Sequence, residues 1–117
     1  MKLVYHLSSC DTCRRIINQL QLKEKGFQLQ DIKTEKISKE QLEAMKLLSG
    51  SFEAIFSRTS RKFKEQNLAA VKLTEPDFKR LILEEYTFLK RPVIIFNKKI
   101  FIGNSKEVVE EALKIIV

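Results

Sequence analysis

Two cysteines separated by two residues are the part of this sequence best suited to chemistry. Cys10 and Cys13 are the only cysteines in 117 residues, and they stand between a short apolar run and a helix-forming stretch. Two thiols one helical turn apart can close a reversible disulfide. The unpaired backbone N–H groups at the start of a helix also favour a thiolate anion. The spacing therefore predicts thiol redox chemistry.

The two thiols have different expected roles. Cys10 is the candidate nucleophile, and Cys13 is the candidate resolving thiol, which attacks a mixed disulfide on Cys10 and releases the partner. An inert buried thiol is the alternative for Cys10, but it does not explain why the cysteines come as a CxxC pair at a helix start, and a zinc ligand is the alternative for Cys13. A closed zinc site needs four ligands. The cysteines and His6, the only histidine, supply at most three, so a closed site would need a second chain, and we expect no metal. Nothing in the sequence implies a bound organic cofactor either.

Polar residues near the pair can assist it. His6 precedes Cys10 by four residues, and Thr12 lies inside the CxxC loop. A protonated imidazole near Cys10 would favour the thiolate. The alternative is that His6 is a structural residue at the end of a buried strand. Thr12 offers a hydroxyl to the same loop and is a candidate substrate-binding group.

The first third of the chain has the pattern of a strand, a helix and a second strand. Residues 2–7 contain β-branched and aromatic side chains and no breaker, which predicts a strand. Residues 10–25 have apolar side chains at helical spacing, and Gly26 stands where a left-handed stop is expected. Residues 27–32 alternate apolar and polar side chains, as a half-buried strand does. The cysteines then lie at the first strand-to-helix turn.

The middle of the chain, about residues 36–88, is predicted to be helical material inserted in the same domain. Ser38 and Gln41 form a capping-box pattern, and the helix that they open is expected to stop near Gly50. Residues 60–66 predict a short helix. Another helix is expected to begin at Thr74, because a proline and acidic residues occupy its first turn.

The last third predicts a hairpin and a terminal helix. Pro92 precedes the almost wholly apolar run 93–96, which suits a buried strand, and residues 100–102 form the expected return strand. Asn104 and Glu107 are expected to cap the last helix. The predicted order is β-α-β, a helical middle, then β-β-α, an α/β class.

This order, with a CxxC at its first turn and a proline before the hairpin, resembles the thioredoxin fold with a mixed central sheet. In that fold the proline at the position of Pro92 is usually cis and lies against the active cysteines. Since cis X–Pro bonds make up only about 5–6% of such bonds, this expectation is specific. The helical insertion lies between the N-terminal βαβ and the C-terminal ββα units, within a single domain of residues 1–117.

Three segments resemble the arsenate reductase (ArsC) family, which includes the Spx transcription regulators. They are YHLSSCDTCR at 5–14, IFSRTSR at 55–61 and RPVII at 91–95. The likeness extends over nearly the whole chain, including the helical insertion. The histidine four residues before the cysteine and the Arg-Pro-strand signature are fairly specific in combination.

The resemblance implies roles for several residues. In the family the first cysteine attacks an oxyanion that arginines hold, so Cys10 takes the nucleophile position and His6 that of a nearby histidine. Arg91 takes the position of the arginine before the cis-proline, where a planar guanidinium suits a tetrahedral oxyanion; a surface ion pair is the alternative. Arg58 and Arg61 flank the position of a further family arginine and are substrate-binding candidates, although they can also belong to a solvated face.

Two functions from different classes follow. The first is a thiol oxidoreductase whose substrate is an oxyanion or an oxidised sulfur, reset by thioredoxin or by glutathione with glutaredoxin. The second is an Spx-like regulator, in which the CxxC is a redox switch and the protein binds the RNA polymerase alpha subunit. Cys13 suits the second well, because Spx-like members have a second cysteine there. Gly50 lies near the part of the chain where those members have a characteristic glycine.

Bulk properties set the remaining expectations. The net charge is +7 at pH 7, which indicates a solvated basic surface or an anionic partner. We find no nucleic-acid-binding motif, and no apolar run approaches the roughly 20 residues needed to cross a bilayer. We expect a cytoplasmic monomer, in which the CxxC is mostly reduced and a disulfide is transient.

Overall fold

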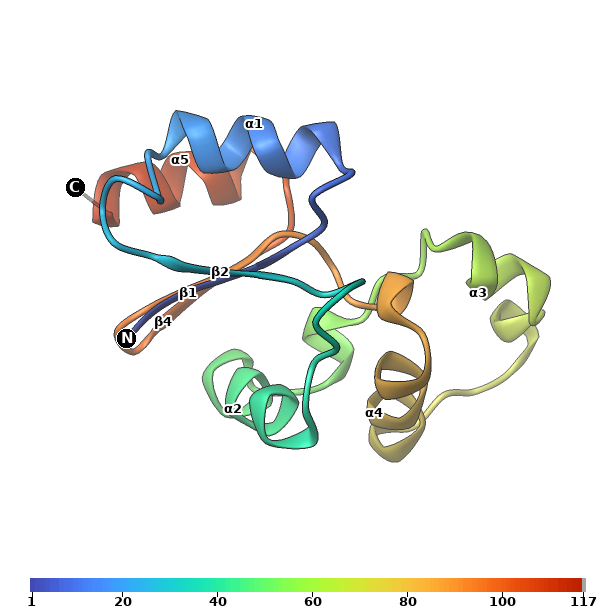
Figure 1. Ribbon diagram of the computed structural model, residues 1–117. Helices are drawn as coiled ribbons and strands as arrows, with labels where there is room; N and C mark the ends of the chain where they lie inside the picture. Colours follow the sequence, from blue (N-terminus) through green and yellow to red (C-terminus); the bar gives the residue numbers. More distant parts are fainter. Residues whose placement is uncertain (117) are drawn as a thin grey trace. The chain divides into compact units, whose positions relative to one another are not determined.

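The chain divides into two compact units in a computed structural model that describes residues 1–116 (Figure 1). The first, called here the sheet unit, consists of Met1–Glu35 and the chain from Arg91 onward. The second, the helical unit, is Lys36–Lys90, and it contains the helical material predicted around residues 36–88. The expected single domain stays a prediction. Within residues 1–116, no helix is long and apolar enough to span a membrane.

The sheet unit is built on a mixed four-stranded sheet, as predicted, with the strand order β2-β1-β3-β4. The strands are β1 (Lys2–His6), β2 (Gln28–Asp31), β3 (Val93–Phe96) and β4 (Lys99–Ile102). Strand β1 pairs parallel with β2 and antiparallel with β3, and β3 pairs antiparallel with β4. The end of β1 at His6 is therefore next to Asp31 of β2, and Tyr5 is opposite Val93 of β3.

Helices α1 (Asp11–Gln19) and α5 (Lys106–Ile115) lie on the same face of this sheet (Figure 1). Their apolar sides and the sheet form one cluster in which each buried aliphatic side chain contributes roughly 1.5–3 kcal/mol. The buried members of the cluster are Val4, Ile16, Ile17, Leu20, Leu22, Phe27, Ile94, Phe101, Ala112 and Ile116. This packing fixes α1 on the sheet and thereby the position of the CxxC at its N-terminus.

Two predicted helix boundaries are wrong. Helix α1 ends at Gln19 and not near residue 25, because Gln21 is left-handed with φ 53° and turns the chain back. The N–H of Leu22 then donates to the carbonyl of Ile17 at 3.1 Å, and the side chain of Leu22 is buried in the core just after the helix ends. The N-cap of α5 is Ser105 and not Asn104, since the Ser105 hydroxyl accepts a hydrogen bond from the N–H of Val108.

The helical unit contains three α-helices and three short 3₁₀ helices between residues 36 and 90. They are α2 (Lys39–Ser49), η1 (Glu53–Ile55), α3 (Arg61–Glu65), η2 (Leu68–Ala70), α4 (Glu75–Glu84) and η3 (Tyr86–Phe88). Phe56 is 2% exposed and contacts the rings of Phe63, Phe78 and Phe88. An aromatic cluster thus forms the centre of this unit.

The predicted helix signals of the helical unit are confirmed. Ser38 and Gln41 form a reciprocal capping box at α2, and Gly50 ends that helix with φ 97°. At α4, the Asp77 carboxylate accepts hydrogen bonds from the N–H and the hydroxyl of Thr74, both at 2.8 Å. These local interactions satisfy backbone groups that a helix end leaves unpaired.

Candidate active site

The CxxC turn joins the end of β1 to the start of α1. Cys10 is the N-cap of α1 with an extended backbone (φ −92°, ψ 113°), and its N–H donates to the carbonyl of Leu7 at 3.1 Å. Thr12 and Cys13 are the second and third residues of the helix, so their N–H groups are among those that α1 leaves unpaired. The turn therefore directs partial positive charge toward the side chain of Cys10.

Cys10 is a half-buried free thiol with a lowered pKa. Burial opposes ionisation, but it is outweighed by the N–H and the thiol of Cys13, the N–H of Thr12 and the guanidinium of Arg91. The surrounding donors therefore act mainly on the anion, which is the reactive form of a cysteine.

Cys13 is a free thiol with no exposed surface. Its pKa is raised to about 11, mainly by burial and also by the neighbouring Cys10. The N–H of Leu7 and the charge of Arg91 lower this pKa but do not offset the two causes that raise it. Cys13 is thus protonated at neutral pH and donates its proton toward the Cys10 sulfur. Cys10 thus ionises at lower pH than Cys13, the difference that a nucleophile and a resolving cysteine require.

Arg91 stands directly before Pro92 at the start of β3, and the Arg91–Pro92 bond is cis, as predicted. Because β3 pairs with β1, this guanidinium comes close enough to lower the pKa of both cysteines. Its Nη1 atom is buried and has no hydrogen-bond partner in the described chain. A buried charged donor without a partner is suited to an anion.

His6 is the last residue of β1, and it is 9% exposed. Burial lowers its pKa, while the Asp31 carboxylate acts in the opposite direction. A neutral imidazole at pH 7 follows, and the groups that favour the Cys10 thiolate are those of Cys13, Thr12 and Arg91. The structure thus brings together four of the predicted site residues, Cys10, Thr12, Cys13 and Arg91. The role of His6 stays a prediction.

Arg58 and Arg61 belong to the helical unit. Arg58 forms an ion pair with Glu53 at 2.9 Å, and its guanidinium lies 5.4 Å from the ring centre of Phe78. Arg61 is the exposed first residue of α3. Both are cations on the surface of their own unit, and their predicted role in binding substrate stays a prediction.

Sequence reasoning did not identify Asp31. Its carboxylate accepts hydrogen bonds from the Ser8 hydroxyl and the Lys33 N–H, and these bonds lower its pKa. The signal was available, because parallel strands place their carboxyl ends at one edge of a sheet. Asp31 ends the strand that pairs with β1, so it had to lie near the CxxC turn.

No group of three histidine, cysteine, aspartate or glutamate side chains within residues 1–116 is arranged to hold a metal ion.

This fold and site define a class: a thioredoxin-like α/β protein with two thiols of opposite pKa shift at its first strand-to-helix turn and an arginine near them. A model of the ArsC family matches residues 5–112. The chain belongs to the ArsC family.

Curated relatives agree with this assignment, and a solved structure shares the fold. The chain is 28% identical over 114 residues to the global transcriptional regulator Spx of Enterococcus faecalis, covering 97% of this chain and 86% of that one. It is also 28% identical over 100 residues to the regulatory protein MgsR of Bacillus subtilis, covering 85% and 79%. An arsenate reductase from Vibrio cholerae has a similar fold, with a TM-score of 0.79 at 19% identity, covering 99% and 97%.

Proposed function

We propose that this protein is a thiol oxidoreductase in which Cys10 is the nucleophile and Cys13 resolves the intermediate. The observation that supports it best is the contrast between the two neighbouring thiols, since the pKa of Cys10 is lowered and that of Cys13 is raised to about 11. A thiolate attacks, and a protonated thiol beside it waits until it is activated.

The substrate class in this proposal is an oxidised sulfur or an arsenic oxyanion. With a disulfide, the Cys10 thiolate attacks one sulfur, an S–S bond to Cys10 forms and the other sulfur leaves as a thiolate. Cys13 then loses its proton and attacks the Cys10 sulfur, so that the second thiolate leaves and a Cys10–Cys13 disulfide remains. The protein loses two electrons and the substrate gains two.

Arsenate follows the same balance. Cys10 displaces hydroxide or water from arsenic(V), and Cys13 then attacks the Cys10 sulfur. The electron pair of the S–As bond stays on arsenic, which leaves as arsenic(III). The unpartnered Nη1 atom of Arg91 is the group that we assign to the oxyanion. Thioredoxin, or glutathione with glutaredoxin, is the proposed external reductant that returns both thiols.

Trapping tests this proposal. Reduced wild-type protein, Cys10→Ser and Cys13→Ser are each mixed with glutathione disulfide or with arsenate and glutathione, and the products are identified by intact mass and peptide mapping. Wild type should form the Cys10–Cys13 disulfide, and Cys13→Ser should accumulate a glutathione adduct on Cys10. Cys10→Ser should do neither. Equal oxidation of Cys10→Ser and wild type with every oxidant would contradict the assignment.

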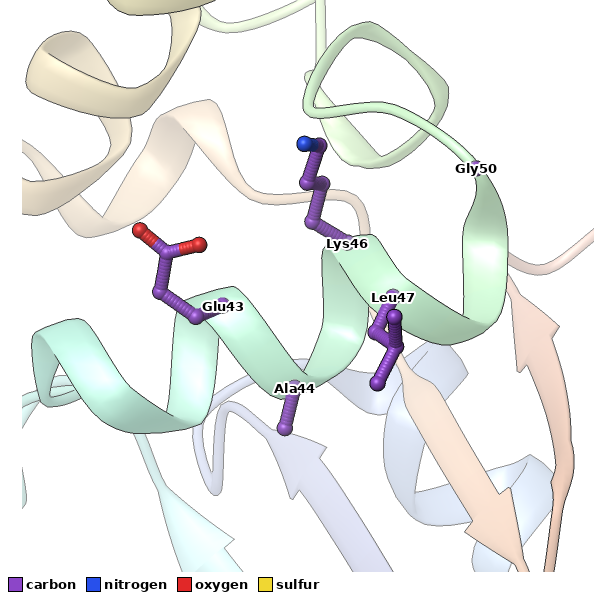
Figure 2. A pocket seen from close by; sticks show the side chains of 5 residues that line it. All are labelled: Glu43, Ala44, Lys46, Leu47 and Gly50. Atoms are coloured by element: carbon purple, nitrogen blue, oxygen red, sulfur yellow. The ribbon is translucent and has the colours of Figure 1, made fainter.

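A second candidate function is a redox-switched regulator similar to Spx. The similarity to proteins named as regulators favours it. In the helical unit, a hollow of about 440 Å³ lies along the end of α2 (Figure 2), next to Gly50 and to Leu47, which is 84% exposed. An exposed leucine beside a hollow is a candidate contact for a protein partner. The proposed partner is the RNA polymerase alpha subunit.

A pull-down separates the two functions. The alpha subunit is offered to the reduced and the oxidised protein, with Leu47→Asp as the test variant and Val71→Asp as its control, since Val71 is 54% exposed in the same unit. The regulator predicts binding that depends on redox state and is lost only in Leu47→Asp. Absence of binding in both redox states contradicts the regulator and leaves the oxidoreductase unaffected.

A further inference from the structure

A second hollow lies in the sheet unit beside the end of β1. Its volume is about 350 Å³, which is within the size range of small-molecule sites. Three elements contribute to it: β1 with the loop after it, the outer part of α1 with its following loop, and β2. The residues that line it, called here the His6 hollow, are His6, Ser8, Arg14, Ile17, Asn18, Lys23 and Leu29.

The lining of the His6 hollow is divided between apolar and polar groups. Ile17 is 5% exposed, and Leu29 is partly buried against the core of the sheet unit. The Asn18 amide and the Ser8 hydroxyl add neutral hydrogen-bonding groups. A ligand that fits such a lining has a short apolar part and a polar end.

The charged members of the lining are both cations. Arg14 and Lys23 line the hollow, and Lys23 is close enough to His6 for its charge to act on the imidazole. Two carboxylates lie nearby but outside the lining, and both are already bonded. Asp11 pairs with Arg14, and Asp31 accepts from Ser8 and from the Lys33 N–H.

Arg14 is only partly committed to these contacts. One terminal nitrogen bonds to Asp11 and the other donates to the Ser8 carbonyl at 3.1 Å, while 57% of the side chain is exposed. A guanidinium carries five donors, so it can keep these bonds and still bind an anion. Ion pairs on an exposed surface contribute about 0–1 kcal/mol, and the pair with Asp11 is therefore weak competition.

His6 gives evidence for a ligand site in the hollow that is independent of the two cations. The residue is 9% exposed and lines the hollow, and its buried Nδ1 atom has no hydrogen-bond partner among residues 1–116. A buried polar atom without a partner is uncommon and is costly to maintain. Burial holds the imidazole neutral at pH 7, so the ring adds no charge of its own and leaves Arg14 and Lys23 to set the sign of the ligand.

We propose that the His6 hollow binds a small organic carboxylate. The carboxylate contacts Arg14 and Lys23, the Asn18 amide donates to it, and a short apolar tail covers Ile17 and Leu29. The imidazole of His6 forms one wall of the site. This site is separate from the thiol chemistry of Cys10 and does not depend on it.

Nuclear magnetic resonance tests the proposal with butyrate as the probe, at constant ionic strength balanced with chloride. Because the chain has one histidine, the imidazole C–H signals are unambiguous. We expect saturable shifts of these signals and of the Asn18 side-chain amide in the millimolar range. Lys23→Met should weaken binding tenfold or more, whereas Lys98→Met, which removes an exposed cation of the β3–β4 turn, should leave it unchanged.

Further arms separate the outcomes. Butanol should bind at least tenfold more weakly than butyrate, and inorganic phosphate should also bind more weakly because it lacks the apolar tail. Equal binding of butanol, or of phosphate, overturns the carboxylate assignment, and so does equal binding of butyrate by wild type and Lys23→Met. Cys10→Ser should bind butyrate like wild type, so failure of the thiol mechanism and failure of this site are distinguishable. Arg14→Gln provides a second loss variant, and the spectrum of each variant reports whether it is folded.

Discussion

Two side-chain nitrogens in the sheet unit are buried without a hydrogen-bond partner in the described chain, and their side chains differ in whether they can lose a proton. Arg91 Nη1 lies near Cys10, and His6 Nδ1 lies by the His6 hollow. Arginine cannot lose its proton in a protein, so Arg91 remains a fixed positive charge. Histidine can, and burial lowers the pKa of His6 so that the ring is neutral.

The difference assigns separate tasks to Arg91 and His6. A fixed charge beside Cys10 stabilises a thiolate at every pH at which the protein is folded, and it remains available to an anionic substrate. A neutral imidazole adds no such stabilisation and acts as a wall. Variants of the two residues should therefore affect different measurements.

The largest expected effect is on thiol reactivity. Cys10→Ser should slow alkylation by iodoacetamide at pH 7 about a hundredfold or more, because the remaining thiol, Cys13, is buried and its pKa is raised. Cys13→Ser should keep a fast-reacting thiol. The rate is measured by mass spectrometry under pseudo-first-order conditions. A fast phase of alkylation that survives in Cys10→Ser would show that Cys10 is not the reactive cysteine.

The next effect compares the fixed charge with the neutral ring. Arg91→Met should raise the pKa of Cys10 and slow its alkylation at pH 7 several-fold, because the charge that favours the thiolate is removed. Arg91→Lys should retain much of the rate. The measurement is the pH dependence of alkylation, and Arg15→Met, which removes an exposed cation from α1, serves as the control.

His6→Gln belongs to the same experiment. Since His6 is absent from the groups that act most strongly on Cys10, its profile should follow that of wild type. A His6→Gln profile displaced as far as that of Arg91→Met would remove the distinction between the two nitrogens.

The sequence predicted the parts of the site that depend on local order. The CxxC at a helix start, the cis bond before Pro92, the capping box at Ser38 and the order of elements along the chain all follow from neighbours in sequence or from the family resemblance. The length of α1 was predicted wrongly because Gln21 is left-handed and the chain turns there, which places Leu22 in the core. Helical periodicity in the sequence does not reveal this turn.

Other parts depend on register and on tertiary burial, which the sequence pattern did not resolve. Asp31 meets Ser8 only because β2 pairs with β1 in one particular register. The neutral state of His6 follows from its burial, and a lone histidine at a strand end has no signal for that. Likewise, a cation such as Arg58 is visible in the sequence, but its pairing with Glu53 is not.

A smaller effect is the pH dependence of stability that His6 causes. The folded pKa of His6 is below its usual value of about 6.5, so the unfolded chain binds more protons between the two values and the free energy of unfolding falls as the pH decreases through this window. His6→Gln should lose less stability than wild type between pH 7.5 and pH 5, measured by urea unfolding. Equal losses would show that His6 does not titrate differently on unfolding.

The smallest expected effect is on Asp31, at the side of the turn that faces His6. The Ser8 hydroxyl is the largest cause of its lowered pKa, so Ser8→Ala should move the pKa of Asp31 up toward the ordinary value for aspartate. The carboxyl ¹³C shift of Asp31 as a function of pH measures this, with Ser9→Ala as the matched control. An unchanged pKa of Asp31 in Ser8→Ala would show that the Ser8 hydroxyl is not the cause of the lowered pKa of this carboxyl.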